Sequence, residues 1–142
     1  MSRYSETCLD SNVLVRSVEA APRPEIKNLW RRWMRDHVVL HAPALLRYEV
    51  TNALHRMRMA GQLSPLAANR AMASVLKRQI VLHHDDELHL RALDMAATYG
   101  LPAAYDAHYL ALAQRLGVEL WTTDARLVRA VEDRLAWVRL VS

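Results

Sequence analysis

The sequence predicts an α/β domain with three layers, α/β/α, and a central parallel sheet of about five strands. Short apolar runs alternate with longer helical patterns along the chain, as expected when helices cover both faces of a parallel sheet. The runs also lack the polar–apolar alternation of a half-exposed sheet. With 142 residues, the chain is predicted to form a single domain, residues 1–142.

The first half of the chain is predicted to contain two strands and two helices. A strand is expected over residues 7–10 and another over residues 38–41. Between them, helical spacing relates Ile26, Leu29, Trp30, Trp33 and His37. Pro43 is expected to open the next helix, which ends at Gly61.

The second half continues the alternation. Ser64 and Pro65 are suited to the N-cap and first position of a helix that reaches about residue 79. A run of acids, residues 85–87, favours a helix start because the helix dipole attracts negative charge. The remaining predicted elements are a strand at 80–83, a helix from 85 to Gly100, a helix at 104–116, a strand at 118–122, a helix after residue 124 and a strand at 137–141.

Composition limits the possible functions. The formal net charge is +4 with a pI near 9.6, and 17 of the 19 basic residues are arginine, which favours an anionic partner such as nucleic acid. Hydrophobic residues make up 52% of the chain, too many for a disordered protein. Cys8, the single cysteine, cannot form an internal disulfide and is expected to be buried. No leader or membrane segment is evident, so a cytoplasmic protein is expected.

Two aspartates follow predicted strands. Asp10 comes at the end of the first strand, and Asp124 follows the strand at 118–122. Because parallel strands present their carboxyl ends at one edge of a sheet, both side chains are expected at the same crevice. Each could instead serve only as the N-cap of the helix that follows.

Two further acids interrupt apolar helix faces. Glu49 lies three residues after Leu46 and four before Ala53, and Asp106 lies four residues before Leu110. A carboxylate on such a face is unfavourable unless a cation or hydrogen bonds compensate its charge. The alternative is that Glu49 and Asp106 are helix-start acids that interact with the helix dipole.

Together, the four acids indicate a metal site. Four clustered carboxylates repel one another, and a hard divalent cation such as Mg²⁺ removes this conflict. Metal-assisted hydrolysis of a phosphodiester suits an acidic cleft on a basic protein. Asn12 and Thr122, which lie two residues from Asp10 and Asp124, are placed to orient water or a ligand.

Four segments that contain these acids resemble the motifs of PIN domains, and most closely those of VapC-type ribonuclease toxins. In chain order they read CLDSNVL, LLRYEVTNAL, YDAHYLALA and LWTTDARL, at residues 8–14, 45–54, 105–113 and 120–127. The resemblance covers nearly the whole chain. The ordered set is specific, although each motif alone is weak.

The resemblance implies an endoribonuclease that depends on Mg²⁺ or Mn²⁺ and leaves 5′-phosphate and 3′-hydroxyl ends. It implies Asp10 and Asp106 as the principal metal ligands and Asp124 as a ligand bound directly or through water. Glu49 would bind metal or position the attacking water. It also implies a homodimer, an RNA substrate and an inhibitory antitoxin protein.

Several other residues are candidates for binding or structural roles. Arg16, Arg47 and Arg126 lie closest in sequence to the acids and are candidates for RNA binding, or else are solvated surface residues. The segment from His83 to His89 matches no familiar zinc spacing and is interpreted as structural. Two further groups suit core or interface positions. The first is Trp30, Trp33 and Met34, for which RNA stacking is an alternative. The second is Met57 and Met59 with Arg56 and Arg58, which suit an antitoxin or dimer interface.

The sequence argues against two other protein classes and leaves one non-enzymatic alternative. A haloacid-dehalogenase-type phosphatase needs a second aspartate where Asn12 stands. A receiver domain needs a lysine near the last strands, and neither Lys27 nor Lys77 lies there. A PIN-like RNA-binding or scaffold module without catalysis remains the alternative, although four clustered acids do not suit a protein that only binds phosphate.

Overall fold

Five strands form the centre of the computed structural model, which describes residues 5–141. They are β1 (Glu6–Leu9), β2 (Val39–Pro43), β3 (Ile80–His83), β4 (Glu119–Thr122) and β5 (Val138–Leu140). All pair in parallel, in the spatial order β3-β2-β1-β4-β5. The predicted parallel sheet is confirmed.

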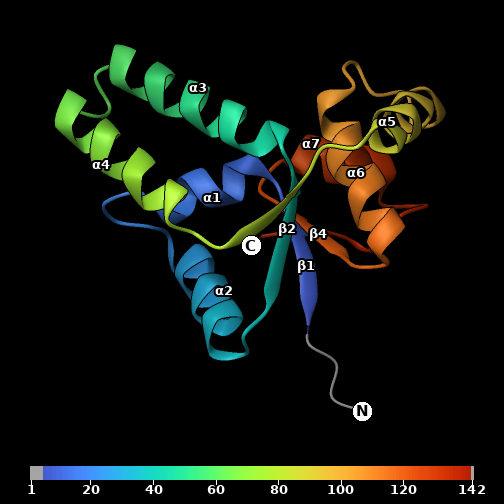
Figure 1. The fold of residues 1–142 in the computed structure, drawn as a ribbon, viewed down its shortest axis with the longest axis horizontal. Helices are drawn as coiled ribbons and strands as arrows, with labels where there is room; N and C mark the ends of the chain where they lie inside the picture. The colour runs from blue at the N-terminus through green and yellow to red at the C-terminus, as the bar shows by residue number, and fades with distance from the viewer. Residues whose placement is uncertain (1–4, 142) are drawn as a thin grey trace.

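Seven helices surround the sheet in the described part of the chain. They are α1 (Ser11–Ser17), α2 (Pro24–Arg35), α3 (Leu45–Met59), α4 (Pro65–Leu76), α5 (Asp86–Thr98), α6 (Tyr105–Leu116) and α7 (Ala125–Val131). Figure 1 shows α1 to α4 on one side of the sheet and α5 and α6 on the other. The three-layer α/β/α architecture is therefore confirmed.

The strand order reverses next to β1. The chain proceeds from β1 outward to β2 and β3, and then returns to place β4 on the other side of β1. Asp10 follows β1 and hydrogen-bonds through its backbone N–H to the Trp121 carbonyl of β4, at 2.9 Å. In open parallel sheets this reversal leaves a crevice at the carboxyl ends of the strands, where ligands bind.

Two predicted details were wrong. Pro43 is the last residue of β2 and does not open a helix, because its fixed φ suits the extended backbone at a strand end; α3 begins two residues later, at Leu45. The sequence reasoning also missed α1, a helix of 7 residues capped by Asp10. Its consecutive buried residues Val13, Leu14 and Val15 show no helical periodicity.

The core lies between the sheet and its covering helices. Cys8 is fully buried, and burial raises the pKa of its thiol to about 12, which makes it a poor nucleophile.

The structure does not describe residues 1–4 or residue 142. The expectation that the chain has no leader rests partly on residues 1–4 and so lies partly outside the described residues. Across residues 5–141, no helix combines the length and apolar character needed to cross a membrane.

Candidate active site

Asp10 and Asp124 stand at the ends of the two strands that flank the reversal. The Asp10 carboxylate accepts a hydrogen bond from the Ser11 backbone N–H at 2.7 Å, at the start of α1. The Asp124 carboxylate accepts from the Arg126 N–H at 2.9 Å, at the start of α7. Both aspartates are therefore N-caps, as the alternative interpretation held, and both also lie at the same edge of the sheet.

Thr122 and Asn12 connect these two aspartates. The buried Thr122 hydroxyl donates to Asp10 Oδ2 at 2.9 Å and accepts from the Asp124 backbone N–H at 3.0 Å. The Asn12 amide donates to Asp10 Oδ2 and Thr122 Oγ1, at 3.2 Å each, while its carbonyl oxygen accepts from the Thr123 N–H. The orientation of Asp10 is thus determined by side chains from β4 and α1.

The other two acids come from α3 and α6. Glu49 Oε1 accepts a 2.6 Å hydrogen bond from the hydroxyl of Tyr109 on α6. Asp106 lies in the first turn of α6, where the helix dipole favours a carboxylate. Glu49 is the fifth residue of α3 and lies beyond its first turn, so its interpretation as a helix-start acid was wrong.

The four carboxylates influence one another. Asp10 is 4% exposed, and burial, followed by the charges of Asp106 and Glu49, raises its pKa to about 7. The pKa of Asp106 is raised by burial and by the charges of Asp124 and Glu49. Among the described residues, none of these acids forms an ion pair with Lys, Arg or His. The cluster therefore carries negative charge that no Lys, Arg or His of residues 5–141 compensates in an ion pair.

The carboxylate oxygens suit a hard cation, although the carboxylates alone do not surround a metal position. Within residues 5–141, no group of three or more His, Cys, Asp or Glu side chains is placed to hold a metal ion by itself. Mg²⁺ retains several waters and is commonly bound through one or two carboxylates together with substrate phosphate. The oxygen-only donors and the uncompensated charge of the cluster fit such an ion.

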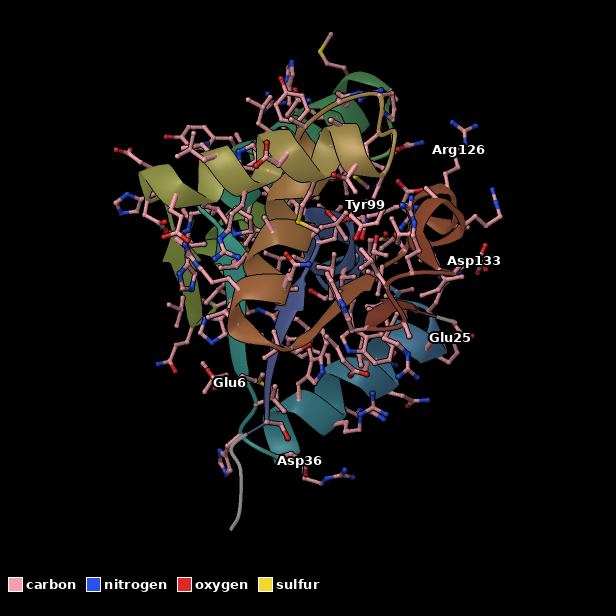
Figure 2. The ribbon with its side chains drawn as sticks, turned by 90° about the vertical axis from the view of Figure 1, so that its right-hand side faces the viewer. Glu6, Glu25, Asp36, Tyr99, Arg126 and Asp133 are labelled. Atoms are coloured by element: carbon pink, nitrogen blue, oxygen red, sulfur yellow. The ribbon has the colours of Figure 1, made fainter. Side chains whose placement is uncertain are left out.

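Among the described residues, the side chains of the three candidate RNA-binding arginines make no hydrogen bond to the four acids, although the Arg126 backbone N–H donates to Asp124. Arg16 forms an exposed ion pair with Glu19 at 3.1 Å. Arg47 is exposed in the first turn of α3. Figure 2 shows the Arg126 side chain pointing outward from the body of the protein, near α7.

The histidine-rich segment has several separate partners. His83 lies 3.0 Å from a ring nitrogen of His41, and His89 lies 2.9 Å from one of His108. Asp85 caps α5. The pattern of contacts agrees with the structural interpretation of this segment.

The aromatic and methionine groups differ in exposure. Trp33 is buried in the core, Trp30 is half-buried, and Met34 is exposed. On α3, Met57 packs partly against the core, whereas Met59 is exposed.

Tyr109 was not identified from the sequence as part of the site. It is fully buried, and burial together with the charges of Asp10 and Glu49 raises the pKa of its hydroxyl. The available signal was its position three residues after Asp106, on the same face of the helix. A buried tyrosine also needs a hydrogen-bond partner, but the sequence did not show that Glu49 would be that partner.

Comparisons with known proteins identify the family. Residues 7–133 match the family model of the PIN domain, and the chain belongs to this family. Over 91 residues it is 36% identical to Ribonuclease VapC3 of Mycobacterium tuberculosis. That alignment covers 64% of this chain and spans 64% of the length of the relative.

Solved structures share the fold. PAE2754 from Pyrobaculum aerophilum superposes with a TM-score of 0.66 at 26% identity, covering 89% of this chain and 80% of that one. A toxin-antitoxin complex from Klebsiella pneumoniae gives 0.60 at 18% identity, with coverage of 84% and 88%. FitAcB from Neisseria gonorrhoeae gives 0.61 at 17% identity, with coverage of 87% and 91%. At these last two identities the likeness concerns the fold alone.

Proposed function

We propose that this protein is a metal-dependent endoribonuclease and the toxin of a toxin–antitoxin pair. The observation that carries the proposal is the buried Asp10, which lies close enough to Asp106 and Glu49 for their charges to raise its pKa and which forms no ion pair within residues 5–141. Membership of the PIN family and the similarity to Ribonuclease VapC3 support RNA as the substrate.

The roles proposed for the acids are those that the resemblance to PIN domains implies. Asp10 and Asp106 would be the principal ligands of Mg²⁺ or Mn²⁺, with Asp124 bound directly or through water. When bound, the ion would polarise the scissile phosphate and activate water. Glu49 would bind metal or hold the attacking water, with its carboxylate oriented by Tyr109. Thr122 and Asn12 hold Asp10 in place.

Cleavage of labelled single-stranded RNA tests the proposal. We expect EDTA to abolish cleavage, and Asp10→Ala or Asp106→Ala to remove it while circular dichroism stays unchanged. Asp94→Ala, which removes an exposed carboxylate from α5, is the matched control and should cleave like the parent. Equal cleavage by Asp10→Ala, Asp106→Ala and the parent would refute the proposal.

The alternative, a PIN-like module that binds RNA without cleaving it, makes a different prediction. Such a module has no need of divalent metal, so calorimetry would detect no binding of Mg²⁺ or Mn²⁺ to the parent protein. We expect metal binding by the parent and weakened binding by Asp10→Ala, since Asp10 is a proposed principal ligand.

An antitoxin and a second copy of the chain are the proposed protein partners. A mainly apolar groove of about 310 Å³ between α1, α3 and α4, lined in part by Leu54, Met57 and Leu63, suits an antitoxin segment. The exposed Leu90 and Leu93 of α5 suit a dimer contact. Co-expression with a small upstream reading frame would test the first proposal, and light scattering of the purified protein would test the second.

A further inference from the structure

A second hollow lies at the opposite end of the sheet from the acidic cluster. It has a volume of about 620 Å³ and lies between α2, the segment that joins α4 to β3, and the first residues of β2 and β3. Trp30, Trp33 and Met34 provide apolar surface, while Lys77 and Arg78 provide positive charge. Among the described residues, no aspartate or glutamate lines it.

Arg78 lacks an acidic partner in this hollow. Its guanidinium lies 4.5 Å from the centroid of the Trp30 ring, and partial burial lowers its pKa. Within residues 5–141 it forms no ion pair, whereas Arg115 pairs with Asp85 at 2.7 Å. A partly desolvated guanidinium is favoured when an anion accepts its hydrogen bonds, and phosphate matches its planar geometry.

A smaller hollow adjoins the other side of Trp30. It has a volume of about 180 Å³ and is lined by Ile26, Lys27 and Arg31 of α2 among others, again with no acid in the part of the chain described. The only two lysines of the sequence, Lys27 and Lys77, therefore line different hollows, and Trp30 lines both.

We propose that the two hollows form a second RNA-contact site, in which bases of a single strand stack at Trp30 while neighbouring phosphates contact Arg78 and Lys77 on one side and Lys27 and Arg31 on the other. An aromatic ring between basic groups matches the alternation of base and phosphate in a nucleic-acid strand. An acidic peptide would satisfy the cations equally well, but it would not need the ring between them.

The site is separate from the proposed catalytic centre. The hollow is lined by Val39 and Ile80, where β2 and β3 begin, while the acids follow the carboxyl ends of the strands. A strand of four residues spans about 13 Å. Figure 2 shows the end of α2 at Asp36 near Glu6 at the start of β1, far from Arg126. We therefore expect the second RNA-contact site to contribute to the binding of long RNA but not to the cleavage of short RNA.

Binding in EDTA tests the site without cleavage. The probe is a fluorescein-labelled single-stranded RNA of about 12 nucleotides, a length within the range that such sites bind, followed by fluorescence anisotropy. We expect Arg78→Glu to weaken binding about tenfold or more. Arg56→Glu, the same charge change on the exposed face of α3, should weaken it less than about twofold. Equal losses in the two variants, or no loss in either, would overturn the proposal.

A second experiment uses the parent protein alone, so its result does not depend on whether a variant folds. Ultraviolet cross-linking of the parent to the same RNA, followed by peptide mass spectrometry, should place a cross-link at Trp30. Cross-links confined to other segments would overturn the proposal. So would an Arg78→Glu variant that loses binding to a polyglutamate peptide but binds the RNA as tightly as the parent does.

Kinetics separate this inference from the proposed function on which it rests. With long RNA, Arg78→Glu should raise KM and leave kcat unchanged, and with a trinucleotide substrate neither constant should change. Failure of the parent to cleave RNA would refute the ribonuclease, while the binding and cross-linking results would still decide whether the hollows contact RNA. Intact cleavage with unchanged KM on long RNA would refute the second site alone.

Discussion

The hydroxyl of Tyr109 donates a 2.6 Å hydrogen bond to Glu49 Oε1, joining α6 to α3 across the candidate site. Tyr109 is fully buried, so its ring cannot move without disturbing the core. Glu49 is only half-buried, so packing alone does not fix its carboxylate. The bond therefore positions one proposed catalytic carboxylate against a rigid helix.

Replacing Tyr109 with Phe should lower kcat for RNA cleavage while preserving the fold. The ring remains and only the hydroxyl is lost, so the melting temperature should change little. Residues that orient metal-site ligands typically contribute about 10-fold to 100-fold in activity or metal affinity, and we expect at least the lower figure. Steady-state kinetics and Mn²⁺ titration would measure the two effects.

The control for this change is Tyr105→Phe, on the same helix. Tyr105 is exposed, and loss of its hydroxyl should leave kcat and metal affinity unchanged. If Tyr109→Phe cleaves RNA as fast as Tyr105→Phe, the bond to Glu49 has no positioning role.

Asp10→Asn should stabilise the metal-free protein at pH 8. Because burial raises the pKa of Asp10 to about 7, above the ordinary value near 3.8, the folded protein holds this proton more tightly than the unfolded chain. Its stability should therefore fall as pH rises from about 4 to 7. The neutral amide removes this loss, and we expect a gain on the order of 4 kcal/mol at pH 8.

Urea unfolding at several pH values in EDTA would measure this gain. The parent and Asp10→Asn should converge below about pH 3, where the carboxyl is protonated in both the folded and the unfolded state. Adding Mg²⁺ at pH 8 should stabilise the parent more than Asp10→Asn. A difference between the two proteins that stays constant from pH 4 to pH 8 would contradict the expected titration.

Thr122→Val should destabilise the protein and impair cleavage, whereas Thr122→Ser should do neither strongly. The Thr122 hydroxyl bonds Asp10, Asn12 and the backbone of Asp124. Valine has a similar shape but leaves these groups without that partner, which costs about 1 to 3 kcal/mol for a buried group. Chemical denaturation and cleavage assays of both variants would distinguish loss of the hydroxyl from loss of the methyl group.

The sequence predicted the sheet because its strands are short, mostly apolar runs that alternate with longer helical patterns. The placement of Asp10 and Asp124 at one edge followed from the rule that parallel strands end together. Their catalytic role stays a prediction.

Tertiary contacts account for what the sequence did not reveal. The helix α1 was missed because Val13, Leu14 and Val15 are all buried, and burial on every side hides a helical period. The bond between Tyr109 and Glu49 joins residues 60 positions apart, which no local pattern specifies. The hollows around Trp30 likewise depend on how α2 packs against β2 and β3.

His37→Gly should stabilise the protein. His37 has a φ of 52° and follows α2 in a turn of the same type as the turns that end α3, α5 and α6. In each turn, the residue after the left-handed one donates its N–H to the carbonyl five residues earlier, as Val38 does to Trp33 at 2.9 Å. The other three turns use the three glycines of the chain, because a side chain is unfavourable in this conformation.

Urea denaturation should show a gain of roughly 0.5 to 1 kcal/mol for His37→Gly at an unchanged m-value. His84→Gly, at an exposed position without positive φ, is the control and should bring no gain. Because His37 also lines the larger hollow beside Trp30, a strained histidine there is consistent with selection for its side chain. If so, the more stable His37→Gly protein should bind the 12-nucleotide RNA more weakly than the parent, and unchanged binding would leave the strain without a function in RNA contact.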